Sequence, residues 1–349
     1  MLSLNLKSVA TAAVVAAGLV LAAAPAKANS KKAKTPRNWQ SIRYTSSYDN
    51  TQQQAIIRVS KSKEPRPLLV TLHTWSFGYA RTTSYVPWAE PYDFHMIGPD
   101  FRGANNKGNK LSMGSDAAVA DIVSAVEYMK KHYKVDEKRI YLIGGSGGGH
   151  MALLMAGRHP EIWAGVSAWC PISDIVAWFK FHKGRGYGLH ISQNLGGNPL
   201  KDAAIKAEAM KRSPVAYLHR AKDIPVDIAT GIHDGHKGSV PVSHTLNAFN
   251  CIVSEKDRFS AEEIAFIDAK EAIPAHLPKP EHDPSYGSRT VLLRRVSGNS
   301  RVTIFEGAHH IIGNAGVAWL ARQVKGAKAD WSVPAAGKES NGSGEVLSK

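Results

Sequence analysis

Cysteine is scarce in this sequence, because its 349 residues include only Cys170 and Cys251. Neither belongs to a C-x-x-C pair, which argues against cysteine-based zinc and redox motifs. Cys170 ends the apolar run VSAWC, where a buried free thiol is the usual outcome. We therefore expect free cysteines, although an exported protein could also join the two in a disulfide.

Acidic residues are also few, with 29 Asp and Glu against 44 Lys and Arg and a net charge of +15 at pH 7. This excess suits an anionic glycan, envelope surface or nucleic acid, or it is simply the charge of a basic surface. No zinc-finger or RNA-binding signature accompanies the basic cluster between Lys31 and Arg37. We expect no nucleic-acid partner and keep an anionic substrate or surface as a prediction.

A long apolar run occurs near the N-terminus and nowhere else. Lys7 precedes the Ala-rich stretch 9–24, and Ala26-Lys27-Ala28 follows as a small-x-small cleavage site, which is typical of a secretory signal peptide. The run is short for a membrane span. We expect residues 1–28 to be removed, the protein to be periplasmic or secreted, and no transmembrane segment to remain. Loss of two lysines and no acids would lower the net charge from +15 to +13.

The rest of the chain predicts a mostly parallel α/β sheet, because strand patterns alternate with helix patterns. We expect a flexible basic leader over 29–48, one catalytic domain over 49–326 and a polar tail over 327–349. The end of the leader already has the pattern of a strand. The expected strands are 41–48, 53–62, 67–73, 94–100, 139–144, 163–169, 225–232 and 301–307, and the expected helices are one starting after Ser115 and those at 150–158, 260–273 and 316–324. Long insertions at 171–222 and 250–290 predict a lid or walls over a site.

One serine stands among glycines between a predicted strand and a predicted helix. The segment 144–148 reads GGSGG and matches G-x-S-x-G, with Ser146 at its centre. A sharp turn there would strain the serine backbone, point its hydroxyl outward and place it at a helix N-terminus. Ser146 is therefore the predicted nucleophile, and the Gly147 N–H a predicted oxyanion donor. No lysine follows for a phosphate loop, and His150 replaces the third glycine of a dinucleotide site, so we expect no cofactor.

A serine nucleophile needs a base and an orienting acid, and in this architecture they follow in the order acid, then histidine. Asp234 comes directly after the strand at 225–232. It is the predicted acid, with Asp257 and Asp223 as less well placed alternatives and an ordinary Asp-Gly turn as the other interpretation. His309 follows the strand at 301–307 and is the predicted base. Its neighbour His310 is the alternative, since successive residues of an extended loop point opposite ways.

Two further groups of residues are weaker candidates. His233 and His236 have an H-x-x-H spacing, but no third ligand lies nearby in the sequence, so we expect no metal. The loop after the strand at 67–73 should supply a second oxyanion donor from the N–H of Thr74 or Trp75. Asp100 and Arg102 are expected to fix loop structure rather than to act in catalysis. Predicted substrate contacts are Tyr79, Trp178 and Phe179, for which ordinary packing is the alternative.

These segments together resemble a known family. LHTWS, GPDFRG, GGSGGGHMALLMAGRHP, WCPISD, HDGHKGSVP and RVTIFEGAHH, in this order, resemble the prolyl-oligopeptidase-type (S9-like) branch of the α/β-hydrolases over about residues 50–325. The resemblance implies the α/β-hydrolase fold and a stand-alone serine hydrolase domain without a β-propeller. The family usually has Gly-Gly-His-Glu at the base, which aligns with 307–310 and supports His309. Its acid usually lies closer to Val240-Pro241, where this chain has Lys237, so Asp234 requires a different loop.

The resemblance leaves the substrate open. We expect an exported serine hydrolase that cleaves ester or peptide bonds through an acyl-enzyme formed by Ser146, Asp234 and His309. A carbohydrate or small-molecule carboxylesterase, such as an acetyl esterase, is the alternative to a peptidase. A hydrolase-like scaffold that only binds an envelope or glycan is the third hypothesis.

Overall fold

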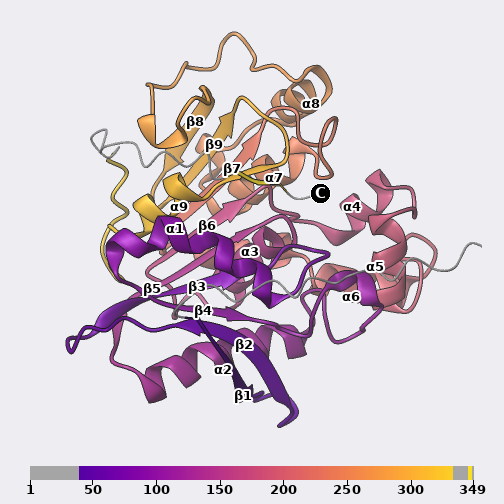
Figure 1. Cartoon of the computed structure of the whole chain (residues 1–349). Helices are drawn as coiled ribbons and strands as arrows, with labels where there is room; N and C mark the ends of the chain where they lie inside the picture. Colours follow the sequence, from indigo (N-terminus) through magenta and orange to yellow (C-terminus); the bar gives the residue numbers. More distant parts are fainter. Residues whose placement is uncertain (1–38, 333–344, 348–349) are drawn as a thin grey trace, which may run out of the picture. The chain divides into compact units, whose positions relative to one another are not determined.

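A computed structural model describes residues 39–332 and 345–347 of the chain (Figure 1). The predicted signal peptide at 1–28 and the leader up to residue 38 lie outside the described residues. Both cysteines are free thiols, as expected, with Cys170 buried and Cys251 partly exposed. None of the helices formed by these residues combines the length and hydrophobicity needed to cross a membrane.

The core of the fold is a nine-stranded sheet in the order β1-β2-β4-β3-β5-β6-β7-β9-β8. Strands β4, β3, β5, β6, β7 and β9 run parallel, while β1, β2 and β8 pair antiparallel at the two edges. The strands are β1 Gln40–Thr45, β2 Gln52–Arg58, β3 Arg66–Leu72, β4 His95–Pro99, β5 Val135–Gly145, β6 Gly165–Trp169, β7 Val226–Gly231, β8 Val291–Ser297 and β9 Ser300–Phe305. The mostly parallel α/β sheet is therefore confirmed.

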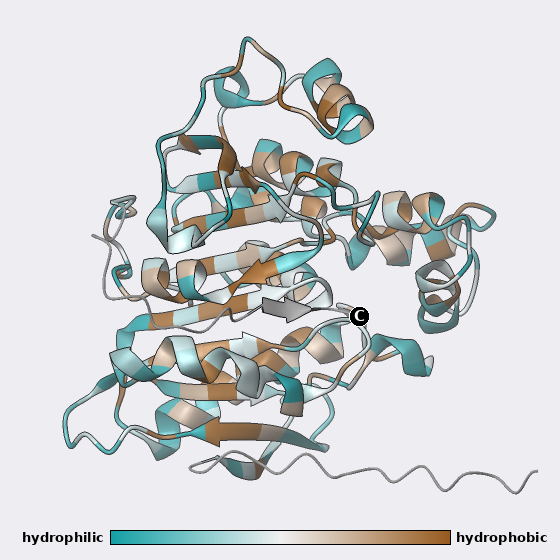
Figure 2. Ribbon diagram, turned by 45° about the horizontal axis from the view of Figure 1, so that its top comes forward, coloured by the Kyte–Doolittle hydropathy of each residue, from teal (hydrophilic) through white to brown (hydrophobic). Residues whose placement is uncertain are grey.

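Helices cover both faces of this sheet. The α-helices of the described residues are α1 Val86–Ala89, α2 Asp116–His132, α3 Gly147–Arg158, α4 Ile175–Phe181, α5 Tyr187–Leu195, α6 Ala203–Lys211, α7 Val242–Ile252, α8 Ala261–Lys270 and α9 Gly313–Leu320. Alternate residues of a buried strand point to opposite faces. In β5, Ile140 and Leu142 pack with α2, α3 and α7, whereas Tyr141 and Ile143 pack with α1 and α9. Figure 2 shows the resulting concentration of hydrophobic residues along the strands.

Helix α2 begins where the sequence predicts. The Ser115 hydroxyl accepts a hydrogen bond from the Ala118 N–H, which satisfies one of the unpaired donors of the first turn. Helix α8 begins at a capping box formed by Ser260 and Glu263, inside the helix expected at 260–273. Helix α9 starts and ends earlier than the predicted 316–324. Strand β8 was not predicted.

The insertion at 171–222 forms a small helical layer of its own. Helices α4, α5 and α6 lie together beyond one end of the sheet (Figure 1). They share a separate apolar cluster with the loop that follows β3, whose largest members are Trp75, Trp178 and Phe179. These three helices therefore pack on the loops at the end of the sheet, whereas Leu218 and Ala221, later in the insertion, belong to the main core.

The structured region extends beyond the predicted domain boundaries at both ends. Strand β1 lies inside the range 29–48 that was expected to be a flexible leader, and the side chain of Trp39 is buried. Residue Trp331, in the predicted tail, stacks on Trp319 with ring centroids 5.3 Å apart. Further along the tail, β11 (Glu345–Leu347) pairs antiparallel with β10 (His310–Ile312). Ordered elements thus also occur outside the range 49–326.

Candidate active site

Ser146 lies in a sharp turn between β5 and α3. Its backbone has φ 57° and ψ −122°, a conformation that residues with a Cβ rarely adopt. The Ser146 N–H donates to the carbonyl of Trp169, 2.8 Å away, at the end of the neighbouring strand β6. The side chain is 5% exposed. The turn thus presents a single hydroxyl at the carboxyl edge of the sheet.

The glycines after Ser146 allow the chain after β3 to come very close. A Cβ on Gly147 would lie 2.5 Å from the Trp75 nitrogen, and one on Gly148 would lie 2.5 Å from the Leu72 carbonyl oxygen. Real Cβ atoms do not tolerate such distances, so both positions require glycine. The main chain of Trp75 thereby lies directly against Gly147.

Those two N–H groups are available to a ligand. The Gly147 N–H belongs to the first residue of α3 and has no partner within the helix. The Trp75 N–H takes part in none of the hydrogen bonds of the described residues, whereas the Trp75 carbonyl accepts from Asn105. Of the two candidates for the second donor, Trp75 is the one beside Gly147. Thr74 instead offers its carbonyl to the His73 ring at 2.9 Å.

The structure brings Asp234 and His309 together, although 75 residues separate them. Nδ1 of His309 donates to Oδ2 of Asp234 at 2.6 Å. The other carboxylate oxygen accepts from the N–H groups of Gly235 and Val240 at 3.0 and 3.1 Å. The Asp234 side chain is completely buried, and His309 is 8% exposed. The carboxylate is therefore held from both sides and can orient the imidazole ring.

The neighbouring histidine does not share this arrangement. Nδ1 of His310 accepts a hydrogen bond from the N–H of Ala308 at 3.0 Å, and His310 begins β10. Of the alternative acids, Asp257 bonds to Ser297, at the hairpin between β8 and β9. Asp223 accepts from Asn299 in the same hairpin. That hairpin precedes β9, so both alternatives lie at the amino ends of the parallel strands, whereas Asp234 lies at their carboxyl ends.

Ser146 and the Asp234–His309 pair share this edge because of the strand order. β5, which precedes Ser146, and β7, which precedes Asp234, flank β6, and β9 lies next to β7. A Cβ on Gly145 would lie 2.0 Å from Cδ1 of Ile311, so the loop that carries His309 passes over the turn. Nε2 of His309 is buried and has no hydrogen-bond partner within the described residues. No group of the described residues therefore competes for hydrogen bonding to this nitrogen.

Burial and charge act in opposite directions on the histidine. Burial alone would lower the pKa of His309, but the Asp234 carboxylate beside it raises the pKa well above the usual value. Burial raises the pKa of the nearby Cys170 thiol. The protonated imidazole is thus favoured once it forms, which is what a general base in acyl transfer requires.

Aromatic residues connect the two loops that flank the site. Trp75, in the loop after β3, meets the edge of Trp178 on α4 with ring centroids 4.7 Å apart. Nε1 of Trp178 donates to the carbonyl of Ser239, in the loop that follows Asp234, at 2.8 Å. The indole of Trp178 is fully buried. It therefore contacts the loop after β3 and the loop after Asp234 at once.

The remaining predicted contacts lie elsewhere. Phe179 is buried in the same apolar cluster as Trp178. Tyr79 lies outside that cluster. Its hydroxyl donates to Gln54 on β2, and its N–H donates to Asp100. Substrate contact by these aromatic residues stays a prediction. Arg102 bonds to Asp49 and Asp121 and fixes the loops around β1 and α2.

His233 and His236 are engaged by acidic and main-chain groups. The two ring nitrogens of His233 lie 2.6 and 2.8 Å from the carboxylates of Glu271 and Glu306. Nε2 of His236 donates to the carbonyl of Asp268. The pair therefore joins the acid loop to α8.

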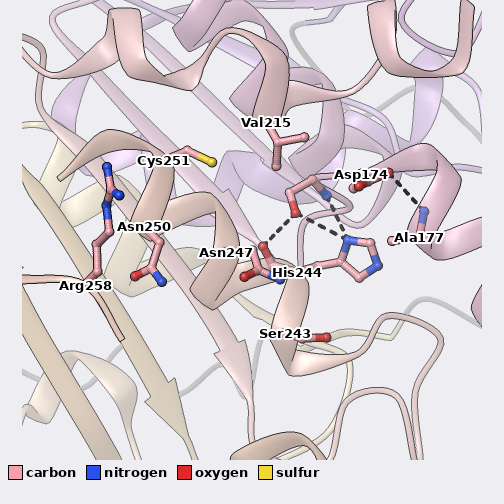
Figure 3. Close-up of a pocket in the computed structure, with 10 residues that line it drawn as sticks. Asp174, Ala177, Val215, Ser243, His244, Asn247, Asn250, Cys251 and Arg258 are labelled. Atoms are coloured by element: carbon pink, nitrogen blue, oxygen red, sulfur yellow. Dashed lines mark hydrogen bonds between the residues drawn. The ribbon is translucent and has the colours of Figure 1, made fainter. Parts of the chain in front are cut away.

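A surface cavity of about 470 Å³ opens beside the site, between the start of α4 and helix α7 (Figure 3). Ser173 anchors its wall, since its hydroxyl donates to the main-chain carbonyl of His244 at 2.8 Å. Arg258 and Asp174 lie at opposite ends of the cavity in Figure 3. Its lining contains neither Ser146 nor the Asp234–His309 pair. The cavity is therefore not the place where an acyl group would meet the serine.

Comparison with known families gives a match that covers slightly more than half of the chain. The sequence profile of the prolyl oligopeptidase family matches residues 82–265. The acylamino-acid-releasing enzyme of Mus musculus is 25% identical over 174 residues, which is 45% of this chain and 22% of that protein. Feruloyl esterase B of Neurospora crassa is 30% identical over 121 residues, 30% of this chain and 39% of that protein. The chain thus spans well under half the length of these relatives.

Solved structures with the same fold cover more of the chain. The 2,6-dihydroxy-pseudo-oxynicotine hydrolase superposes with a TM-score of 0.56 and 13% identity, over 83% of this chain and 70% of that one. A puromycin-hydrolyzing peptidase of Mycobacterium tuberculosis superposes with a TM-score of 0.53 and 16% identity, over 82% of this chain and 40% of that one. At these identities the likeness concerns the α/β-hydrolase fold alone.

Proposed function

The chain belongs to the prolyl oligopeptidase family and is a serine hydrolase, and we propose that Ser146, Asp234 and His309 carry out its chemistry. The observation that supports this most strongly is the 2.6 Å hydrogen bond between the buried Asp234 and His309, at the edge where the strained Ser146 turn lies. A nucleophile, a base and an orienting acid are the groups that hydrolysis through an acyl-enzyme needs.

In the proposed reaction, the Ser146 hydroxyl attacks an acyl carbon and passes its proton to Nε2 of His309. Asp234 stabilises the resulting imidazolium through Nδ1, in agreement with the raised pKa of that ring. The N–H groups of Gly147 and Trp75 hold the oxyanion, each contributing about 3 kcal/mol to transition-state stabilisation. His309 then protonates the leaving group, and water releases the acid from the serine by the same steps in reverse.

The bond cleaved is an ester or a peptide bond. Relatives of both kinds support the proposal, because feruloyl esterase B and acetylxylan esterase A of Aspergillus ficuum are each 30% identical over their matched segments. The acylamino-acid-releasing enzyme supports peptide cleavage at 25% identity. The esterase is the second candidate, favoured by these higher identities.

The test is a side-by-side measurement of kcat/KM for an aryl acetate and a proline-containing peptide anilide. Ser146→Ala serves as the blank for each substrate. Rapid acetate turnover without anilide cleavage would identify an esterase, and clear anilide cleavage a peptidase. The proposal is wrong if neither rate exceeds that of Ser146→Ala. A fluorophosphonate probe located on Ser146 by peptide mass spectrometry would confirm the nucleophile independently of the substrate.

We further propose that the protein is exported. Lys7, the apolar stretch 9–24 and the small residues at 26 and 28 support a cleaved signal peptide. Mass spectrometry of the protein from its producing cell should then find Asn29 as the mature N-terminus, in the periplasmic or secreted fraction. An intact residue 1 in the cytoplasmic fraction would contradict export.

A further inference from the structure

Cys170 lies next to the Asp234–His309 pair. It is the first residue after β6, the strand between β5 and β7, and it is completely buried. Its backbone φ is 45°, a conformation that is strained for a residue with a side chain. Its thiol donates to the carbonyl of His310 at 3.2 Å. The strand order therefore delivers a sulfur atom to the place where the acid and the base meet.

Three metal-binding atoms meet at this point. A sulfur of Cys170, a carboxylate oxygen of Asp234 and a ring nitrogen of His309 all lie within 4.8 Å of one another, and all three residues are buried. Ligand atoms around a tetrahedral zinc ion lie about 3.5 Å apart, given bonds of about 2.0–2.3 Å. Sulfur, nitrogen and oxygen donors together are the set that zinc prefers.

The surroundings of this cluster also suit a cation. Asp234 is the anionic member of the cluster, and its carboxylate is completely buried. In addition, Nε2 of His309 is a buried polar atom without a partner in the described part of the chain. The cluster thus places a thiol beside a buried carboxylate and a buried ring nitrogen without a partner among the described residues.

We propose that Cys170, Asp234 and His309 form an inhibitory site for a thiophilic divalent cation, with Zn²⁺ as the example. The regulatory part of this inference rests on the proposed function, because it requires His309 to be the base. The ion would displace the thiol proton of Cys170 and bind the thiolate, the carboxylate and the imidazole, without any change of oxidation state.

Inhibition follows whichever ring nitrogen binds the ion. A metal on Nε2 occupies the lone pair that must accept the Ser146 proton. A metal on Nδ1 breaks the bond to Asp234 and displaces the hydrogen of Nδ1, which moves to Nε2 as the other tautomer, so that Nε2 cannot accept a proton either. In both cases the serine loses its base, and removal of the metal restores it. Mg²⁺ and Ca²⁺ prefer oxygen ligands only and should have no such effect.

The experiment compares Zn²⁺ sensitivity of the full chain with that of two single-cysteine variants. Ester hydrolysis is measured in metal-free buffer with increasing ZnCl₂, and then with excess EDTA. Inhibition should be reversible in the wild type and in Cys251→Ala, whose cysteine lies outside the cluster. The hydrolytic rate of Cys170→Ala without Zn²⁺ should stay within a few-fold of the wild-type rate. Half-inhibition of this variant should require at least about 100-fold more Zn²⁺ than that of the wild type, because loss of a direct ligand weakens metal binding more than loss of an outer-shell partner.

Binding is measured separately from activity. Titration with Co²⁺ should produce a thiolate-to-cobalt absorption band in the wild type and in Ser146→Ala, but not in Cys170→Ala or Cys170→Ser. Isothermal titration with ZnCl₂ should lose one site in the same two variants, whose folding is checked by thermal melting. Absence of the thiolate band in the folded wild type, or equal Zn²⁺ inhibition of wild type and Cys170→Ala, would overturn the proposal.

The two proposals fail in different ways. If the thiolate band appears but no ester or peptide is hydrolysed, the metal site stands and the proposed function is wrong. If hydrolysis depends on Ser146 but neither binding nor inhibition depends on Cys170, the function stands and the metal site is wrong.

Discussion

On the serine side of the candidate site the main chain fixes the geometry, whereas on the acid–base side buried side chains do so. Ser146 is held by its backbone angles, by the hydrogen bond of its N–H to Trp169 and by glycines that let other chain segments touch it. Asp234 and His309 are held by each other and by hydrogen bonds to the carboxylate. Added side-chain atoms should therefore disrupt the serine side. Loss of a hydrogen-bonding group should disrupt the acid–base side.

The largest expected effect is on the acid–base side. His309→Gln should lower kcat/KM for the best substrate by about 10⁴-fold or more, because the serine then has no base. His310→Gln is the matched control and should change kcat/KM by less than tenfold, since Asp234 is hydrogen-bonded to His309 and the His310 ring accepts from the Ala308 N–H. Steady-state kinetics of both variants decide the assignment. A greater loss for the His310 variant would reverse it.

An intermediate effect is expected on the serine side. Gly147→Ala places a methyl group 2.5 Å from the Trp75 nitrogen and must move one of the two oxyanion donors. The value of kcat/KM should fall by about 100–1000-fold, and stability should fall by about 1–3 kcal/mol through overpacking. Gly188→Ala, on α5, meets only ordinary contacts of 3.5 Å or more. Urea unfolding should find it as stable as the wild type, and equal behaviour of the two variants would contradict the contact.

An effect on stability alone, with no change in the catalytic groups, should be the same on both sides. Burial lowers the pKa of His150, on α3, and of His244, on α7, from 6.5 to about 4. The unfolded chain binds these protons below about pH 6.5 and the folded chain does not, so stability falls as the pH drops from about 6.5 to 4. Each histidine contributes up to about 3 kcal/mol of this loss.

The measurement is the free energy of unfolding in urea at several pH values. His150→Gln keeps the donor to the Arg212 carbonyl, and His244→Asn keeps the acceptor for the Ser173 N–H. Each variant should reduce the pH dependence by one proton. An unchanged slope would show that the histidine in question is not buried as a neutral group.

Prediction from the sequence succeeded where the determinants are local. The turn around Ser146 needs glycines next to the serine, a strand before it and a helix after it, all within about twenty residues. The proximity of Asp234 and His309 could be inferred only from their positions after two strands. The position of Cys170 next to them could not be inferred, because it depends on β6 lying between β5 and β7. Its role stays a proposal.

The helical insertion shows the same limit. Helix α6 buries only Ala209, so its sequence has no apolar stripe to reveal it. Helix α5 contains Gly188 and begins after a left-handed glycine, which weakens its helical pattern. In β8, Arg294 and Arg295 interrupt the apolar alternation that would predict a strand. These elements are stabilised by contacts with distant segments, which a single sequence does not display.

The indole of Trp178 has a consequence for how this domain could acquire new substrates. It comes from the helical insertion at 171–222, yet it contacts both the Trp75 loop and the Ser239 loop. An exchange of the insertion with that of a relative would therefore disturb turnover as well as selectivity, unless a tryptophan or an equivalent brace came with it. A change of substrate specificity through this insertion should therefore also change the rate of turnover. Experiments that graft an insertion onto this chain should retain Trp178.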